Sequence, residues 1–190
     1  FEDNIVEKIV AEKWGFKYDK NKWGIDAERI KEINDIENSF YESNITKFLE
    51  LRNFTGISTI PSQAFYQNQN LEEISLPDRI TSVGNKAFYG CINLKKLIYP
   101  KNVTIIGNEN ISGCTNLEYI HILSNEVVTI TPDSFINSNC DIYIGNGSSP
   151  YHDNTLLERY LNNVRPLVAK GYRLPTQTES SPIFINNTGF

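Results

Sequence analysis

The sequence predicts an α+β protein, in which a solenoid of about four to five short coils is closed at both ends by helical caps. Three observations predict this fold class. An apolar motif returns every 23 or 24 residues through the middle of the chain, the flanking segments show helical periodicity instead, and 39% of the 190 residues are hydrophobic. That apolar content is enough for a packed core and too high for a disordered chain.

Residues 1–43 are expected to form the N-terminal cap, because a solenoid needs terminal units with a polar outer surface. Residues 4–14 have the spacing of an amphipathic helix, whose apolar face would hold Ile5, Ile9, Val6 and Val10. A second helix is expected to begin with Asp26 as its N-cap and to run through Ile30 and Ile33.

Residues 19–25 resemble the first half of a calcium-binding loop, in which Asp and Asn alternate before a glycine. The pattern departs from a working loop at Trp23, which occupies a usual ligand position, and at Ile30, where a bidentate glutamate is needed. Because these two ligands are missing, we expect a metal-free structural relic, with no metal site and no cofactor. Calcium binding is the alternative.

The repeat is anchored by Phe65, Phe88, Ile111 and Phe135, which stand 23, 23 and 24 residues apart. Each anchor ends a motif with two earlier apolar positions, as in Ile80, Val83 and Phe88. Such short apolar segments cannot bury themselves alone, whereas stacked coils join them into continuous columns. We therefore expect the anchors to point into the core.

A second apolar segment follows each anchor, with the spacing L-x-x-I-x-L in residues 71–76, 94–99 and 117–122, and it decays in residues 141–144. Upstream, Phe48 and Leu51 form a half repeat that opens the array. These segments are expected to be the paired strands, about 4.8 Å apart from coil to coil. Their inward residues are predicted to be Ile74, Leu97, Ile120 and Ile144.

The run over residues 80–100 resembles the BspA-like (Treponema pallidum-type) leucine-rich repeat, and the resemblance extends over residues 44–147. It implies a right-handed leucine-rich-repeat solenoid in a bacterial protein that is secreted or held at the outer cell surface. Members of that family are described as adhesins or binding surfaces, and no catalytic residues are associated with the repeat. Any secretion signal or lipid anchor is expected on a segment that precedes this chain.

The exposed face of the strand ladder is the candidate binding surface. Strand alternation predicts one outward column of Glu50, Glu73, Lys96, Tyr119 and Tyr143, and a second of Arg52, Ser75, Ile98, His121 and Gly145. Rigid aromatic and apolar side chains suit a binding surface. The candidate ligand-binding residues are Ile98, Tyr119, His121 and Tyr143. The alternative is that the tyrosines simply pack on a half-buried sheet, or under the C-terminal cap.

Other features of the sequence argue against an enzyme, a nucleic-acid-binding protein and a membrane-spanning protein. His121 and His152 are the only histidines, and neither lies in a catalytic or metal-binding motif. Cys91 and Cys114 occupy the same position in neighbouring coils, where buried free thiols are favoured over a disulfide. A net charge of −5 argues against nucleic acid, and no apolar stretch is long enough to span a membrane. We therefore expect a non-enzymatic module that binds a protein or glycan.

Residues 148–190 are expected to form the C-terminal cap and tail. A helix would begin with Asp153 or Asn154 as its cap and end before Pro166. Two alternatives to a binding module remain at this stage. The chain could be a structural spacer within a larger surface protein, or an enzyme with an unrecognised site.

Overall fold

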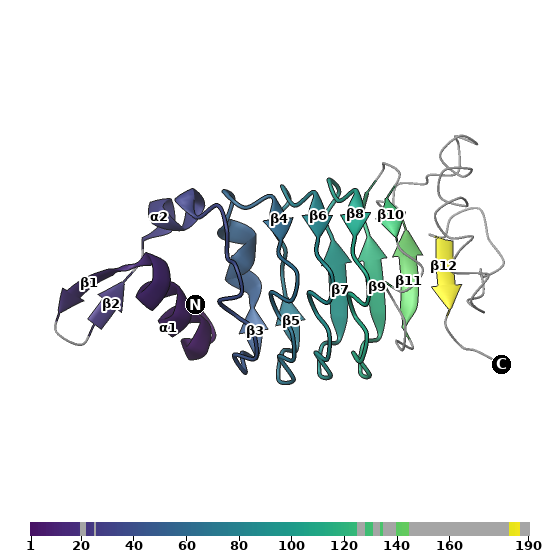
Figure 1. The fold of residues 1–190 in the computed structure, drawn as a ribbon, viewed down its shortest axis with the longest axis horizontal. Coiled ribbons are helices and arrows are strands. Elements are labelled where there is room, and N and C mark those ends of the chain that lie inside the picture. The colour runs from purple at the N-terminus through teal and green to yellow at the C-terminus, as the bar shows by residue number, and fades with distance from the viewer. Residues whose placement is uncertain are drawn as a thin grey trace.

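The computed structural model describes residues 1–19, 22–24, 26–124, 128–130, 134, 140–144 and 183–186. These residues form an elongated, solenoid-like stack, with the N-terminal helices at one end and two rows of short strands running along it (Figure 1). One row holds β4 (Thr59–Ile60), β6 (Ser82–Val83), β8 (Ile105–Ile106) and β10 (Thr129–Ile130). The other holds β3 (Lys47–Phe48), β5 (Glu73–Ile74), β7 (Lys96–Tyr99), β9 (Tyr119–Ile122) and β11 (Asp141–Ile144).

The first row forms one continuous parallel sheet in the order β10-β8-β6-β4. Its register places Thr59 beside Ser82, Ser82 beside Ile105, and Ile105 beside Thr129. These steps equal the spacing of the sequence motif, so each strand is the equivalent segment of the next coil. The repeat and its register are confirmed across this sheet.

The second row is divided. β3 and β5 pair in a sheet of their own, while β7, β9 and β11 form a separate parallel sheet. A further strand, β12 (Ile183–Asn186), pairs antiparallel with the outer edge of β11. The C-terminal helix expected after Asp153 or Asn154 lies outside the described residues.

The core consists of the predicted apolar columns. The anchors Phe65, Phe88 and Ile111 are fully buried, and the rings of Phe65 and Phe88 stack with centroids 5.3 Å apart. Phe135 lies outside the described residues. At the end of the strand column the register differs by two positions from the predicted one, because Ile142 stands beside Ile120 and Ile144 stands beside the buried Ile122.

A polar pair crosses this core between coils. Asn110 occupies the position that Ala64 and Ala87 hold in the preceding coils, and it is fully buried. Its side-chain oxygen accepts a hydrogen bond from the Tyr99 hydroxyl at 2.6 Å, and its Nδ2 donates to the Gly84 carbonyl at 2.7 Å. Burial raises the pKa of Tyr99 well above its usual value. Both buried groups are therefore satisfied, as a stable interior requires.

The N-terminal cap begins with α1 (Asn4–Trp14), as predicted. Its buried face is formed by Val6 and Val10 with Ala11, whereas Ile5 is 40% exposed. The expectation that Ile5 belongs to the packed face is therefore wrong. The helix turns Val6 and Val10 toward the first coil, and this leaves Ile5 on the outer side.

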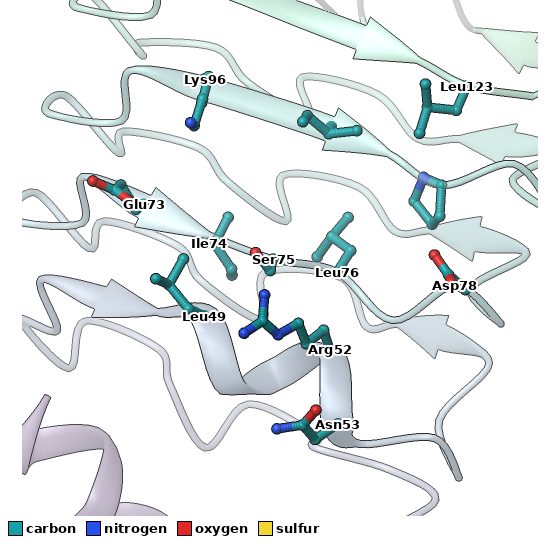
Figure 2. A pocket seen from close by; sticks show the side chains of 12 residues that line it. Leu49, Arg52, Asn53, Glu73, Ile74, Ser75, Leu76, Asp78, Lys96 and Leu123 are labelled. Atoms are coloured by element: carbon teal, nitrogen blue, oxygen red, sulfur yellow. The ribbon is translucent and has the colours of Figure 1, made fainter. Parts of the chain in front are cut away.

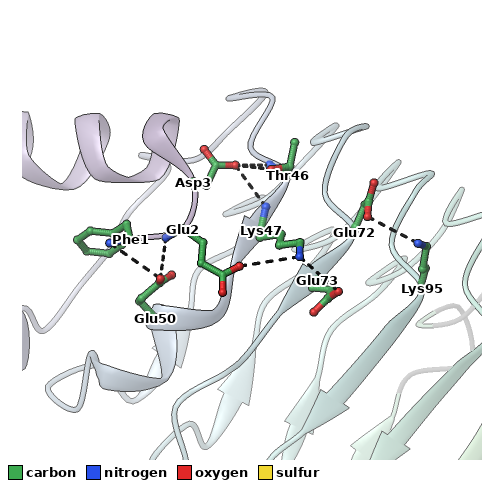
Figure 3. Close-up of polar contacts among 9 residues, drawn as sticks. All are labelled: Phe1, Glu2, Asp3, Thr46, Lys47, Glu50, Glu72, Glu73 and Lys95. Carbon is green, nitrogen blue, oxygen red and sulfur yellow. Dashed lines mark hydrogen bonds and ion pairs between the residues drawn. The ribbon is translucent and has the colours of Figure 1, made fainter.

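Asp3 fixes this helix to the first coil (Figure 3). Its Oδ1 accepts the backbone N–H of Ile5 and caps α1, while its Oδ2 accepts the N–H and the hydroxyl of Thr46 at 2.6 and 2.7 Å. Burial alone would raise the pKa of this carboxyl, but the hydrogen bonds from Thr46, Ile5 and Lys47 lower it. The charged carboxylate thus joins cap and repeat.

The second part of the cap contains α2 (Ala27–Glu32), whose N-cap Asp26 accepts the N–H of Arg29 at 2.7 Å, as predicted. Between the helices, β1 (Phe16–Asp19) and β2 (Lys22–Gly24) pair antiparallel. The stretch that resembles a calcium loop therefore lies across a β-hairpin, although residues 20, 21 and 25 are outside the described part. No cluster of three metal-binding side chains occurs among the described residues.

Candidate functional site

The exposed face of the second row has a different residue order from the one predicted. Lys96 stands beside Tyr119, and Tyr119 beside Asp141. Ile98 stands beside His121, and His121 beside Tyr143. Tyr143 therefore belongs to the column of Ile98 and His121, and not to that of Tyr119. The error comes from the decayed fourth motif, where the spacing between coils differs by two residues from the assumed alignment.

The first coil departs from the predicted columns as well. Lys47, and not Glu50, stands beside Glu73. Glu50 and Arg52 lie in a 3₁₀ helix, η1 (Leu49–Asn53), which follows β3 directly. A 3₁₀ helix rises about 2.0 Å per residue, against about 3.3 Å in a strand, so it cannot continue the ladder. The first coil therefore turns away from the sheet at the point where later coils extend it.

A break in the ladder follows on the other side of β5. The Lys95 N–H donates to the Glu72 carbonyl at 3.3 Å, just before the two strands begin. Beyond this bond, β5 and β7 belong to separate sheets. The strands are thus joined at their amino ends but do not pair farther along.

A groove of about 480 Å³ lies over this break (Figure 2). Its walls come from four parts of the chain: η1, the segment that starts with β5, β7 with Pro100 after it, and Leu123 directly after β9. The lining residues are Leu49, Arg52, Asn53, Glu73, Ile74, Ser75, Leu76, Asp78, Lys96, Ile98, Pro100 and Leu123. The groove therefore opens on the same face of the molecule as the predicted ladder surface.

The groove combines aliphatic and charged side chains. The apolar side chain of Ile98 is 39% exposed. Leu49 and Leu123, which also line the groove, are half-buried. None of the described residues that line it is aromatic. Such a surface favours contact with an aliphatic side chain, because burying exposed aliphatic area gains about 25 cal/mol per Å².

Of the predicted ligand-binding residues, Ile98 lines the groove. Tyr119 and His121 are half-buried on β9, outside the groove, and Tyr143 lies on β11, where the structure does not describe its side chain. Arg52, predicted in the second outward column, is exposed and lies in the groove wall. The spacing of the apolar residues gave no signal for this, because Phe48 and Leu51 stand three residues apart just as Leu71 and Ile74 do in the next repeat.

The two repeat cysteines are packing groups and not reactive thiols. Cys91 and Cys114 are buried and free, as expected, and Cys140 is also buried. The Cys91 and Cys114 thiols each donate to a main-chain carbonyl at 3.1 Å, that of Phe65 and that of Phe88. Burial raises the pKa of Cys114 to about 12 and raises that of Cys91 as well. Because the thiolate is the nucleophile, these residues are packing groups.

A family model described as a BspA type leucine-rich repeat region matches residues 31–149 with six copies, which is more than half of the chain. Proteins of this family are often surface-associated and mediate protein interactions, and they are typically non-enzymatic. Comparison with curated proteins and with solved structures finds no match. In the described part of the chain, no helix combines the length and apolar character that a bilayer span needs.

Proposed function

Because the chain belongs to the BspA-type leucine-rich repeat family, we propose that it is a non-enzymatic adhesion or binding module that holds a partner protein on the exposed face of β5, β7 and β9. The observation that carries this proposal is the groove at the break between β5 and β7. A concave, partly apolar site with a few polar groups is the usual form of a recognition site.

A protein is favoured over a glycan as the partner. Sugars stack on aromatic rings in many binding sites, but the groove is lined by aliphatic and charged side chains. Beyond the groove, β9 holds Tyr119 and His121 and β11 holds Tyr143, and we assign these residues to the outer part of the same interface. Ile98 lies between the two parts, in β7, and is the central apolar contact.

The surface location of the family supports placement of this module at the outer cell surface or outside the cell. We also infer the division expected from the sequence: a cap over residues 1–43, right-handed repeats of about four to five coils over 44–147, and a C-terminal cap over 148–190. The contacts of Asp3 with Thr46 support the first boundary, because they join two differently built units. The family match begins earlier, at residue 31.

The test compares two exposed isoleucines on different sheets. Ile98→Asp alters the proposed face, while Ile105→Asp makes the same change on β8, where Ile105 is 50% exposed. Wild type and both variants are screened against a panel of purified extracellular-matrix proteins and a glycan array. Loss of binding in Ile98→Asp alone, with the melting temperature unchanged, is the expected result.

Three other outcomes would contradict the proposal. Equal binding by both variants to a common partner would place the site elsewhere. Glycan binding that is insensitive to both substitutions would contradict the choice of face and of partner. If no protein of the panel binds, the role of a structural spacer is favoured.

A further inference from the structure

Two cations of the groove have no ion-pair partner among the described residues. They are Arg52, on η1, and Lys96, on β7. Several other lysines lie within 4.0 Å of a carboxylate: Lys13, Lys31, Lys47, Lys86 and Lys95. In a chain with a net charge of −5, two unpaired cations at one groove are available to an anionic ligand.

The cations approach the groove from opposite walls. Figure 2 shows the Arg52 side chain rising from η1 with its guanidinium group directed toward Ser75, and Lys96 on the strand across from it. A guanidinium group presents several N–H donors in one plane and can bind both oxygens of a carboxylate. Ser75 is half-buried and adds a hydroxyl group beside the guanidinium. The guanidinium group beside the Ser75 hydroxyl suits a carboxylate, and Lys96 adds positive charge from the opposite wall, at the Glu73 end of the groove.

The acidic residues of the groove do not cancel these cations. The Glu73 carboxylate is 3.8 Å from the ammonium group of Lys47. Lys47 therefore partly neutralises the charge of Glu73. Asp78 is exposed and lies near the far end of the groove, away from Glu73 (Figure 2). A ligand with its acidic group near Arg52 therefore avoids direct contact with either carboxylate.

We propose that the groove recognises an extended peptide segment of the partner protein, in which an Asp or Glu side chain stands next to an aliphatic side chain. The carboxylate binds to Arg52 beside Ser75, with Lys96 adding attraction from the opposite wall, and the aliphatic side chain packs on Ile98 and Leu123. This inference rests on the proposed function and adds the chemical class of the ligand. Side chains of alternating residues in an extended peptide point to opposite faces, so neighbouring residues can reach different walls of the groove.

The experiment uses a displayed library of random linear peptides of about 12 residues, selected on the immobilised protein. We expect enrichment of peptides in which Asp or Glu stands next to Leu, Ile or Val. An enriched peptide is then synthesised with its acid and with the matching amide (Glu→Gln or Asp→Asn). Its dissociation constant is measured against wild type, Arg52→Gln, Lys96→Gln, Ile98→Asp and the control Lys8→Gln, which removes an exposed cation from α1.

The acidic peptide is expected to bind at least about tenfold more weakly to Arg52→Gln, more weakly by a smaller factor to Lys96→Gln, and equally to Lys8→Gln. The amide peptide should bind weakly to wild type and should be insensitive to Arg52→Gln. Binding of the acidic peptide should also weaken as the salt concentration rises, since the cations are exposed to solvent.

The outcomes separate this inference from the proposed function. Peptides that lose affinity for Ile98→Asp but not for Arg52→Gln would contradict recognition of a carboxylate by Arg52. The proposed binding face would still stand. Enrichment of basic peptides whose binding requires Asp78 would also contradict recognition of a carboxylate. Affinities unchanged in every groove variant, or a library with no enriched peptide, would overturn the peptide site. Loss of binding to the matrix-protein panel in Ile98→Asp would then still support the binding face.

Discussion

The two rows of strands are built by the same repeat but end up with different surfaces. In the row β4-β6-β8-β10, each strand pairs with the next, and the ladder crosses the coils without a gap. In the other row, the ladder stops between β5 and β7 and resumes through β9 and β11. The first row is two residues wide in every coil, whereas the second widens from two residues in β5 to four in β7.

The difference shows how a repeat protein can acquire a local site. A uniform ladder leaves little room between coils, because paired strands lie about 4.8 Å apart. The groove forms where η1 replaces a strand extension and β5 remains short. The continuous row therefore holds the coils in register, while the interrupted row provides the candidate binding site.

The largest expected effect comes from removing an anchor that both rows share. Phe88 is fully buried and stacks on Phe65, so Phe88→Ala is expected to lower the free energy of unfolding by about 3–5 kcal/mol. Chemical denaturation measures the loss. The control is Ile92→Ala, at a residue that is 37% exposed, with an expected change of at most about 0.5 kcal/mol. A nearly neutral Phe88→Ala would show that the neighbouring coils can move to fill the cavity, and that they are not rigid.

A smaller loss is expected where the continuous row brings two backbones together. A Cβ at Gly84 would lie 2.4 Å from the Ser62 nitrogen, and Gly84→Ala is therefore expected to destabilise by about 2–3 kcal/mol. Gly113 is the matched control. A Cβ there would have its nearest neighbour at 3.5 Å, and only the left-handed φ of +79° opposes alanine, at a cost of about 1 kcal/mol. Thermal melts of both variants test whether Gly84→Ala is the more destabilising of the two. If the spacing between coils adapts easily, Gly113→Ala will be the more destabilising.

The junction between cap and repeat gives the next prediction. Asp3→Asn is expected to cost about 1–2 kcal/mol at neutral pH, because an amide cannot accept hydrogen bonds through both of its terminal atoms. Asp26→Asn is the control, since that exposed N-cap accepts the single bond from Arg29, which an amide oxygen can also accept.

The same residue predicts a pH dependence. The pKa of Asp3 is lowered by folding, so its contribution to stability is present above the ordinary value of 3.8 and is lost as the pH falls through the lower folded value. The stability difference between wild type and Asp3→Asn should therefore be constant near neutral pH and shrink below about pH 4. A difference that persists unchanged in acid would show that the charge is not what joins the cap to the first coil.

The smallest effect is expected in the groove itself. Arg52→Gln should change the free energy of unfolding by no more than about 0.5 kcal/mol, because Arg52 is exposed and has no ion pair among the described residues. Denaturation of this variant beside wild type provides the measurement. A clear loss of stability would indicate that the arginine supports η1, and its role in ligand binding would need a separate explanation.

Much of the scaffold could be predicted from the sequence because it repeats. The anchor spacing identified Phe65, Phe88 and Ile111 as buried, and helix signals located α1 and the Asp26 cap. The predictions were wrong where the repeat is incomplete. The first half repeat forms η1 instead of a longer strand, and the last motif pairs two residues away from the assumed alignment.

The sequence by itself determined the coil length, the family and the inward columns, because a period of 23 or 24 residues leaves few other ways to bury those apolar side chains. Only the tertiary structure decided that Arg52, Lys96 and Ile98 share one groove. These residues come from two elements, η1 and β7, and their meeting depends on where the ladder breaks. Strand pairing between coils is a long-range property, so a local pattern of apolar residues does not encode its interruption.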